Sequence, residues 1–257
     1  MSLVINYQSD SIIRKKYIVN TLRYFDRTIT YDRIDYLQLK KILPNVQFRP
    51  LFFLNDYIPI NKSSNKLKYK ITFVGTIHSD RYSIINAIEK MSLKEGYKIY
   101  VYKYLQSYFI YYYYRLINRS FKGTTLNDFD FDKMSAEEIS KIYEESFAIL
   151  DMQYPKNNGL TMRTIETLAA GKKLITTNQD IKYYAFYNPN NILIIDRKNP
   201  IIKKDFFNYD FIDLDNGIMD VYKLNSWIKD IFLYDNPEYT PNTFLRSEEN
   251  ENISNRG

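Results

Sequence analysis

Short apolar runs alternate regularly with amphipathic segments from residue 68 onward. Apolar runs rich in Ile, Val, Tyr and Phe predict strands over 68–76, 97–105, 147–152, 173–177 and 191–196. Apolar residues that recur every three or four positions predict helices over 79–91, 106–117, 135–146, 161–171 and 220–232. Strands that alternate with helices are typical of right-handed βαβ units. The pattern therefore predicts an α/β fold, with a mostly parallel sheet and helices on both faces.

Less regular elements precede this part of the chain. They are a helix over 8–24, a strand over 27–31, a helix over 32–43 and a strand over 46–53. Ser9 or Asp10 would cap the first helix, and Asp32 would open the second. Farther along, Ser135 and Glu138 have the spacing of a capping box. The aromatic segment 106–117 also suits a strand, but its length favours a helix.

The polar segment 55–68 contains Pro59 and two serines without a hydrophobic period, so it is the best candidate for a linker. It divides the chain into a partial N-terminal α/β portion over 1–60 and a ligand-binding domain over 61–235. The residues 236–257 are expected to form a polar, frayed tail. Fewer residues precede the regular part than a complete domain usually has. The N-terminal portion therefore resembles the last part of a domain.

Composition narrows the class of protein. The 257 residues are 45% hydrophobic, which is ample for a buried core. The sequence has no cysteine, so disulfides and thiolate metal sites are excluded, and the single histidine, His78, leaves little for a histidine-based metal site. No apolar run reaches the roughly 18 residues needed to cross a bilayer, and the N-terminus lacks the layout of a signal peptide. We therefore expect a cytoplasmic location.

Positive charge is concentrated in the middle of the chain. Residues 81–122 hold eight Lys or Arg against two Glu, a net charge of +6 that equals the formal charge of the whole chain. Within this window, 97–119 interleaves basic residues with tyrosines. Such a stretch suits an anionic membrane surface or single-stranded nucleic acid, whereas a tyrosine-rich protein also uses these residues for ordinary packing. Peripheral membrane contact through 97–119 is the functional interpretation, and no nucleic acid is expected, because no motif supports it.

Ligands of parallel sheets bind beyond the carboxyl ends of the strands, where two turns of this sequence carry suggestive chemistry. In the first, FVGTIHSDRY, the strand ends at Gly75, and Ser79 or Asp80 can cap the next helix. Free N–H groups at a helix start bind anions, and Arg81 adds a permanent charge with bidentate donors. His78 would donate to a phosphate. The structural alternative is a capped helix with a surface histidine and an arginine in a salt bridge.

The second turn, QYPKNNG, follows the strand that ends at Asp151 and is longer than a plain connection needs. Thr161 can cap the helix that begins after Gly159. Arg163 and Glu166 then lie three residues apart on one helical face. A carboxylate there can accept two hydrogen bonds from the vicinal diol of a ribose. The alternative is a surface ion pair worth roughly a few tenths of a kcal/mol.

The stretch NNGLTMRTIETLAAGKKLITT resembles the donor-binding segment of GT-B fold glycosyltransferases, in which a glycine-containing loop leads into a helix that carries a glutamate. Together with FVGTIHSDRY and FYNPNNILIIDR, it is similar to a bacterial family of capsular and lipopolysaccharide biosynthesis, most strongly over 69–197. The resemblance implies a Rossmann-like, nucleotide-sugar-binding domain. That superfamily often has two glutamates eight residues apart. Here Glu166 is the second and Asn158 stands at the first, so the ribose contact is implied more firmly than the sugar contact.

The resemblance also implies a role for each residue. Glu166 would hold the ribose, and Arg163 would assist the phosphates or pair with Glu166. Backbone N–H groups of Gly159, Leu160 and Thr161 would bind the diphosphate. The facing loop would consist of Gly75, Thr76, His78, Ser79 and Arg81. Such enzymes need neither a metal nor another cofactor, because the helix dipole, backbone donors and basic side chains offset the charge of the leaving diphosphate.

The expected function is therefore hexosyl transfer from a nucleotide-sugar to a glycan or lipid-linked acceptor in capsule or lipopolysaccharide biosynthesis. The protein would work in the cytoplasm or at the inner face of the membrane. Two alternatives stay open. Because 1–60 is short and identifies no catalytic base, the chain could bind a nucleotide-sugar without turning it over, as a scaffold. A basic, tyrosine-rich nucleic-acid binder would instead use 97–119.

Overall fold

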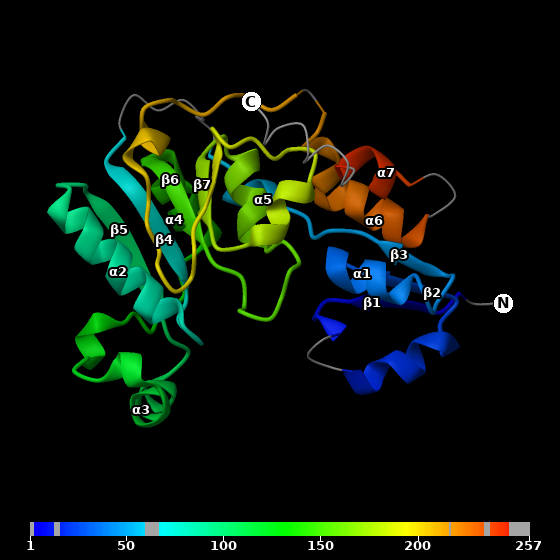
Figure 1. Cartoon of the computed structure of the whole chain (residues 1–257), viewed down its shortest axis with the longest axis horizontal. Coiled ribbons are helices and arrows are strands. Elements are labelled where there is room, and N and C mark those ends of the chain that lie inside the picture. Colours follow the sequence, from blue (N-terminus) through cyan, green and yellow to red (C-terminus); the bar gives the residue numbers. More distant parts are fainter. Residues whose placement is uncertain (1–2, 13–15, 60–66, 216, 234–236, 247–257) are drawn as a thin grey trace.

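A computed structural model gives the structure of the chain and describes residues 3–12, 16–59, 67–215, 217–233 and 237–246. The described strands form two parallel sheets, one of five strands and one of three. Figure 1 shows the five-stranded sheet and its helices in one half of the molecule and the three-stranded sheet in the other. The predicted α/β class, with parallel pairing and helices on both faces, is confirmed.

The five-stranded sheet follows the regular part of the sequence. Its strands pair in the order β5-β4-β6-β7-β8, and every pairing is parallel. The strands are β4 (Tyr69–Thr76), β5 (Ile99–Tyr104), β6 (Ser146–Asp151), β7 (Lys173–Thr176) and β8 (Ile192–Ile194). All five lie where the apolar runs predict them. The inner strands read as nearly continuous apolar runs because helices cover both of their faces.

Helices alternate with these strands along the chain, as the sequence predicts. They are α2 (Arg81–Lys94), α3 (Tyr108–Ile117), α4 (Ala136–Glu144) and α5 (Met162–Ala169). Ser135 and Glu138 form the expected capping box of α4. Thr161 accepts a hydrogen bond from the backbone N–H of Thr164 and so caps α5. The aromatic segment is a helix, as its length predicts.

Alternate residues of each strand pack against different helices. Ile71 and Phe73 of β4 join a cluster with Ile84 and Ile88 of α2 on one face of the sheet. Val74, the residue after Phe73, joins a cluster with Ile139 of α4 on the opposite face. On that same side of the sheet, α5 packs Ile165 and Leu168 against Leu174 of β7. The period of two along the strands therefore sorts the helices into two layers.

The N-terminal half is built on three parallel strands and one well-capped helix. The strands β1 (Ile5–Gln8), β2 (Arg27–Thr30) and β3 (Val46–Phe48) pair in that order. Asp32 caps α1 (Arg33–Leu39), as predicted. The helix predicted over 8–24 is wrong at its start, because β1 occupies residues 5–8 and pairs with β2. A 3₁₀ helix spans Lys16–Tyr24. The strand predicted over 46–53 ends at Phe48, two residues before Pro50, which has no N–H for the ladder.

Helix α6 (Leu224–Phe232) lies against the three-stranded sheet, although it follows the five-stranded one in the sequence. The guanidinium of Arg27 donates to the carbonyl oxygens of Ile231 at 2.6 Å and Asp230 at 3.0 Å. A buried ion pair joins Arg49 Nε to Asp230 Oδ2 at 2.7 Å. Helix α6 thus returns the chain from the five-stranded sheet to the three-stranded one, as Figure 1 shows.

Two segments that were expected to be irregular carry structure. Within the predicted linker, Asn55–Tyr57 form a 3₁₀ turn, while 60–66 lie outside the described residues. The predicted frayed tail is wrong for 237–246, because Tyr239 is buried in the core and α7 (Pro241–Phe244) follows it. The polar composition concealed this because only a few apolar residues provide the contact. Residues 247–257 lie outside the described part.

Asp35 of α1 supplies a prediction about stability. Its Oδ2 accepts the backbone N–H of Ile12 at 2.6 Å. Burial raises the pKa of Asp35 to about 6, although the hydrogen bond from Ile12 opposes the shift. The folded state therefore binds this proton more tightly than the unfolded chain, in which the pKa is about 4. The resulting stabilisation is complete below about pH 4 and is lost as the pH rises through about 6.

We predict that Asp35→Asn removes this part of the pH dependence. Between pH 4 and pH 7 the free energy of unfolding of the unmodified protein should fall by roughly 2 to 3 kcal/mol more than that of the variant. Urea denaturation at unit pH intervals measures the difference. Parallel curves for the two proteins would show that Asp35 titrates alike in the folded and unfolded states.

Candidate functional site

The turn between β4 and α2 is held by Arg81, the first residue of the helix. Its guanidinium donates to the carbonyl oxygen of Thr76 at 2.9 Å and to that of Met152, which follows β6. Its Nε has no hydrogen-bond partner within the described part of the chain. Burial lowers the pKa of Arg81. The side chain therefore brings a fixed, partly desolvated positive charge to the carboxyl ends of two adjacent strands.

The same turn contains an unusual backbone conformation. Ser79 has a positive φ of 51°, which is uncommon outside glycine. Its carbonyl oxygen accepts a hydrogen bond from Asn118 Nδ2 at 3.0 Å, and its hydroxyl lies 3.0 Å from His78 Nδ1. The His78 ring also lies 5.6 Å from the ring of Tyr154 in the facing loop. These contacts bring the two predicted turns together at one sheet edge.

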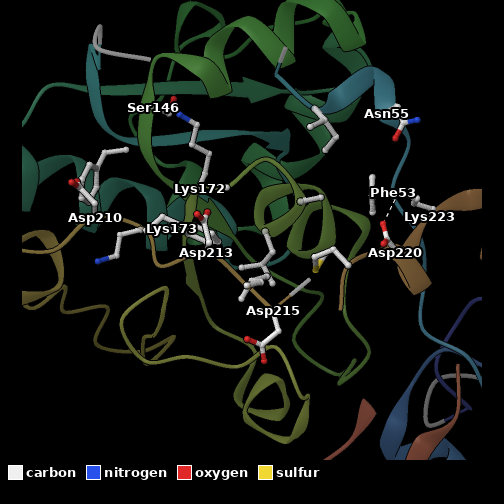
Figure 2. A pocket seen from close by; sticks show the side chains of 18 of the residues that line it. Phe53, Asn55, Ser146, Lys172, Lys173, Asp210, Asp213, Asp215, Asp220 and Lys223 are labelled. Carbon is white, nitrogen blue, oxygen red and sulfur yellow. Dashed lines mark ion pairs between the residues drawn. The ribbon is translucent and has the colours of Figure 1, made fainter. Parts of the chain in front are cut away.

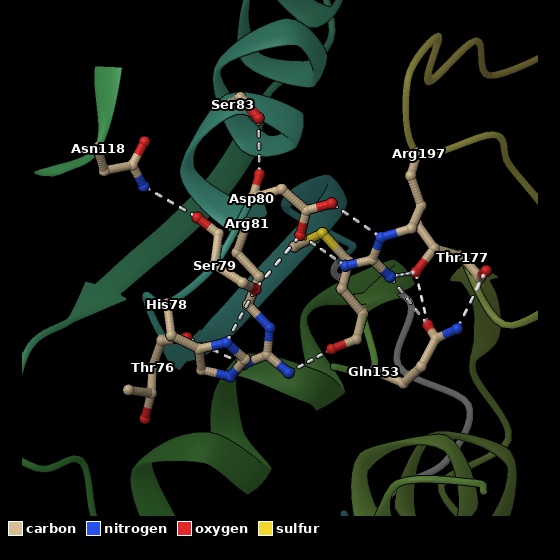
Figure 3. A network of polar contacts seen from close by, with 11 residues as sticks. Thr76, His78, Ser79, Asp80, Arg81, Ser83, Asn118, Gln153, Thr177 and Arg197 are labelled. Carbon is tan, nitrogen blue, oxygen red and sulfur yellow. Dashed lines mark hydrogen bonds and ion pairs between the residues drawn. The ribbon is translucent and has the colours of Figure 1, made fainter. Parts of the chain in front are cut away.

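The sequence predicts that Ser79 or Asp80 caps α2, but no side chain in the described part of the chain caps this helix. Asp80 instead receives a forked ion pair from Arg197, with Oδ1 at 2.7 Å and Oδ2 at 2.9 Å (Figure 3). Burial alone would raise the pKa of Asp80, but the hydrogen bonds and charge of Arg197 more than offset it and lower the pKa. Arg197 also donates to Thr177 Oγ1 at 2.6 Å and Gln153 Oε1 at 3.2 Å.

Arg197 is a site residue that sequence reasoning missed. It stands just after the last strand of the sheet, β8, in the motif FYNPNNILIIDR. A basic residue directly after a buried strand was the available signal, because that position lies at the carboxyl edge where ligands bind.

The turn between β6 and α5 is organised by Asp151, the last residue of β6. Its Oδ2 accepts hydrogen bonds from the hydroxyls of Thr161 and Thr164, both at 2.6 Å. These two hydrogen bonds fix the start of α5 to the end of β6. Thr161 is therefore engaged on both sides, by its own helix and by Asp151.

Arg163 and Glu166 form a buried pair rather than the surface salt bridge that was the alternative. Their side chains are 22% and 5% exposed, and Arg163 Nη1 lies 3.9 Å from Glu166 Oε2. Arg163 also donates to the hydroxyl of Tyr143 and lies over that ring. Burial raises the pKa of Glu166, while the charge of Arg163 opposes the rise. A carboxylate held this way retains acceptor capacity for a hydroxyl ligand.

Three arginines therefore lie at this edge of the sheet. The pKa of Arg81, lowered first by burial, is lowered further by the positive charges of Arg197 and Arg163, against the opposing effect of Asp151. The three side chains come from the turn after β4, the first turn of α5 and the segment after β8. Converging guanidinium groups recognise phosphate or carboxylate well, because their donors are planar and paired. We call Arg81, Arg163 and Arg197 the arginine cluster.

The glycine loop itself faces elsewhere. The backbone N–H groups of Asn158 and Gly159 both donate to Asp32 Oδ2, at 2.9 Å each. The expectation that the Gly159 amide is free for a diphosphate is therefore wrong in this conformation, because a carboxylate of the N-terminal half takes its place. Leu160 is fully buried in the core. The structure thus gathers Thr76, His78, Ser79, Arg81, Thr161, Arg163 and Glu166 at one edge, and turns Asn158 and Gly159 toward Asp32.

Neighbours of Asp32 strengthen this contact between the halves. The guanidinium of Arg33 donates to both carboxylate oxygens of Asp180, with N–O distances of 2.6 to 3.1 Å, and both side chains are buried. The hydroxyl of Tyr31 accepts a hydrogen bond from Asn157 Nδ2 at 3.0 Å. The carboxyl end of β2 therefore faces the loop after β6, so that carboxyl ends of strands from both sheets border the same region.

A large cavity lies at the opposite edge of the five-stranded sheet (Figure 2). Its volume is about 970 Å³, and Ser146 and Lys173, the first residues of β6 and β7, are among its lining. Lys173 is engaged by the carbonyl oxygens of Phe206 and Tyr209 at 2.6 and 2.8 Å. We place the candidate site at the carboxyl edge, because converging cations lie there and parallel sheets bind ligands there.

Within the described ranges, no group of three or more His, Cys, Asp or Glu side chains is placed to hold a metal ion. No helix in those ranges is long and apolar enough to span a bilayer.

No protein-family model matches the sequence, and no curated protein sequence matches it. Among solved structures, Anabaena HepE in complex with UDP and glucose is similar with a TM-score of 0.50 and 10% identity, over 76% of this chain and 58% of that one. The glycosylation associate protein (Gap123) complex from Streptococcus agalactiae is 15% identical over 89% of this chain and 49% of that one, with a TM-score of 0.47. Sucrose-phosphate synthase from Thermosynechococcus elongatus is 12% identical over 96% and 61%, with a TM-score of 0.46.

The chain therefore spans about half the length of the Gap123 structure and 58% of that of HepE. At these identities the likeness shows the fold alone. HepE supports the arrangement of parallel sheets and helices described above.

The packing of Gly159 against Tyr31 gives a testable consequence. A Cβ at position 159 would lie 2.3 Å from the Tyr31 ring. The backbone of Gly159 does not have a positive φ, so the cost of a side chain there comes from packing. We predict that Gly159→Ala lowers the free energy of unfolding by about 1 to 3 kcal/mol, as measured by denaturant titration.

A double variant tests whether the clash is the cause. Adding Tyr31→Leu to Gly159→Ala makes room for the methyl group, so the effects of the two changes should not add. Additive losses in the double-mutant cycle would contradict the close contact between the two halves at this point.

Proposed function

We propose that this chain is a GT-B-type glycosyltransferase, or the donor-binding part of one, and that it binds a nucleotide-sugar at the carboxyl edge of the five-stranded sheet. The observation that carries the proposal is the placement of Arg81, Arg163 and Arg197 on the segments after β4, β6 and β8, with the buried carboxylate of Glu166 beside Arg163. A nucleotide-sugar needs cations for its diphosphate and an acceptor for its ribose hydroxyls. Arg81, Arg163 and Glu166 lie on the turns that the sequence singles out. HepE, which shares the fold, is described in complex with UDP and glucose.

The proposed reaction is a glycosyl transfer in which arginine side chains stabilise the leaving diphosphate. In the transfer, an acceptor hydroxyl oxygen bonds to the anomeric carbon as the bond from that carbon to the diphosphate oxygen breaks. The acceptor proton passes to a general base, and the nucleoside diphosphate leaves with the bonding electrons. Arg81 and Arg163 would stabilise the charge that develops on the diphosphate, because preorganised donors in a partly dry site do so effectively. The proposed reaction uses these side chains in place of a metal or another cofactor.

The sugar, the acceptor and the location that we propose follow from the family resemblance of the sequence. The transferred sugar would be a hexose, and the acceptor a glycan or a lipid-linked glycan of capsule or lipopolysaccharide biosynthesis. The reaction would take place on the cytoplasmic side of the membrane. The acceptor would enter between the two sheets, where the carboxyl ends of β2 and β6 face each other.

A non-catalytic, nucleotide-sugar-binding or scaffold role is the second candidate. It is favoured by the contact of Asp32 with the amides of Asn158 and Gly159, which withholds two donors from a phosphate. Release of nucleoside diphosphate from bound donor, with water or an added glycan as acceptor, distinguishes the two. Binding without any release would favour the scaffold.

We predict that Glu166→Gln weakens nucleotide-sugar binding by about tenfold or more, because a hydrogen bond to a charged acceptor contributes roughly 1.5 to 3 kcal/mol. A thermal-shift panel of UDP-, GDP-, CMP- and dTDP-sugars selects the donor, and calorimetric titration measures its affinity. The matched control is Glu137→Gln, which removes an exposed carboxylate paired with Lys141 and should leave the affinity unchanged. Because Glu166 is buried, the folded fraction of each variant is checked first. Unchanged affinity in folded Glu166→Gln would remove the ribose role.

Arg163→Ala is expected to separate phosphate binding from nucleoside binding. If Arg163 contacts the diphosphate, affinity for the nucleoside diphosphate should fall about tenfold or more, while affinity for the free nucleoside stays the same. The measurement is calorimetric titration with both ligands. Equal losses for the two ligands would instead mean that Arg163 acts through the fold of α5 or through Glu166.

A further inference from the structure

We propose that the outer face of α3 docks on a bilayer that contains anionic lipid, and that it holds the candidate site beside a lipid-linked acceptor. The docking itself stands on the surface of α3. The link to an acceptor rests on the proposed function. We define the α3 face as the six exposed large hydrophobic residues of this helix, which are Tyr108, Phe109, Tyr112, Tyr113, Leu116 and Ile117.

The α3 face is apolar to a degree that a solvated helix seldom shows. Phe109 and Leu116 are 82% and 86% exposed, and they lie seven residues apart on the same side of the helix. The opposite side already anchors the helix. Tyr111 is buried and its hydroxyl donates to the carbonyl oxygen of Thr124 at 2.7 Å, while Ser107 caps the first turn. The exposed residues therefore contribute little to this anchoring, and a partner would account for them.

Charge identifies the partner as anionic. Residues 106–122 contain Arg115, Arg119 and Lys122 and no acidic residue. Arg115 and Arg119 are exposed. Basic side chains beside an aromatic and aliphatic helix face are the combination that binds anionic headgroups while the apolar residues enter the interface. Tyrosine rings suit that boundary, because one end is apolar and the other polar.

The same features disfavour other occupants. A second copy would bring its own three cations against these three, and like charges across a symmetric contact repel. Nucleic acid would use stacked aromatic rings, whereas the α3 face also exposes the aliphatic side chains of Leu116 and Ile117. An adjoining groove of about 410 Å³, lined in part by Tyr108, Tyr112 and Phe131, continues the apolar surface. Hydrocarbon is the environment that fits this set.

Position connects the surface to the site. Asn118, directly after α3, donates to the carbonyl oxygen of Ser79 in the turn that carries Arg81. In Figure 1, α3 lies beyond the carboxyl end of β4, at the sheet edge that holds the arginine cluster. A bilayer in contact with the α3 face would therefore lie next to the entrance of the candidate site. An acceptor carried by a lipid would reach the site without leaving the membrane.

Flotation of the full chain with vesicles tests the docking without any nucleotide-sugar. We expect the protein to float with vesicles of phosphatidylcholine and phosphatidylglycerol, and to bind pure phosphatidylcholine at least about tenfold more weakly, because each basic residue adds to binding at an anionic surface. Phe109→Ser combined with Leu116→Ser should reduce binding to the anionic vesicles at least about tenfold, since two large apolar side chains no longer enter the interface. The matched control is Leu93→Ser combined with Tyr209→Ser, two similarly exposed residues elsewhere, which should bind like the unmodified protein.

The outcomes separate cleanly. Loss of flotation in the α3 variant alone supports the proposal. No flotation of the unmodified protein with either vesicle overturns it, as does equal flotation of the α3 variant. If the unmodified protein is a dimer in size-exclusion chromatography and the α3 variant a monomer that still floats, a second copy covers the face instead. Because calorimetric donor binding is measured without vesicles, failure of this proposal and failure of the proposed transferase give different results.

Discussion

The carboxylate of Asp32 joins the two halves of this protein. Its Oδ1 accepts the N–H groups of Ile34 and Asp35 at the start of α1, and its Oδ2 accepts those of Asn158 and Gly159. A fully buried carboxylate is tolerated only when such donors surround it. One side chain therefore opens a helix in one half and fixes the loop before α5 in the other. Replacing it would leave four backbone donors without their acceptor.

Other contacts depend on the alignment that Asp32 sets. The fork between Arg33 and Asp180 and the hydrogen bond between Tyr31 and Asn157 both cross the same boundary. Helix α6 crosses it again from the far end of the chain through Asp230. A buried charge pair contributes less to net stability than its geometry implies, because both charges lose water. We therefore regard these pairs chiefly as fixing the orientation of the halves.

At the sheet edge the arginine cluster lies among three carboxylates, those of Asp80, Asp151 and Glu166. Arg197 is paired with Asp80, Arg163 shares Glu166 and Tyr143, and Arg81 is held by carbonyl oxygens with its Nε unpartnered among the described atoms. Arg81, held by carbonyl oxygens rather than by a carboxylate, is therefore the cation that best fits an anionic ligand. The amides of the glycine loop are meanwhile occupied by Asp32. Binding of phosphate would therefore rely on side chains first, and on the loop only if the halves move apart.

The sequence by itself determined the local structure. The alternation of apolar runs predicted all five strands of the larger sheet, and short-range signals predicted the caps at Asp32, Ser135 and Thr161, because a helix start depends on residues three positions away. The spacing of Arg163 and Glu166 marked the candidate site, but not the burial of these two side chains.

Only the tertiary structure decided the contacts of distant residues. Arg197 and Asp80 are 117 positions apart, and Asp32 and Gly159 are 127 apart. Strand β1 and the crossing of α6 belong to the same class, because the four residues of β1 have a weak local preference and pairing with β2 defines them. Local patterns report which face of an element is apolar, whereas the partner of that face is chosen only when the whole chain packs.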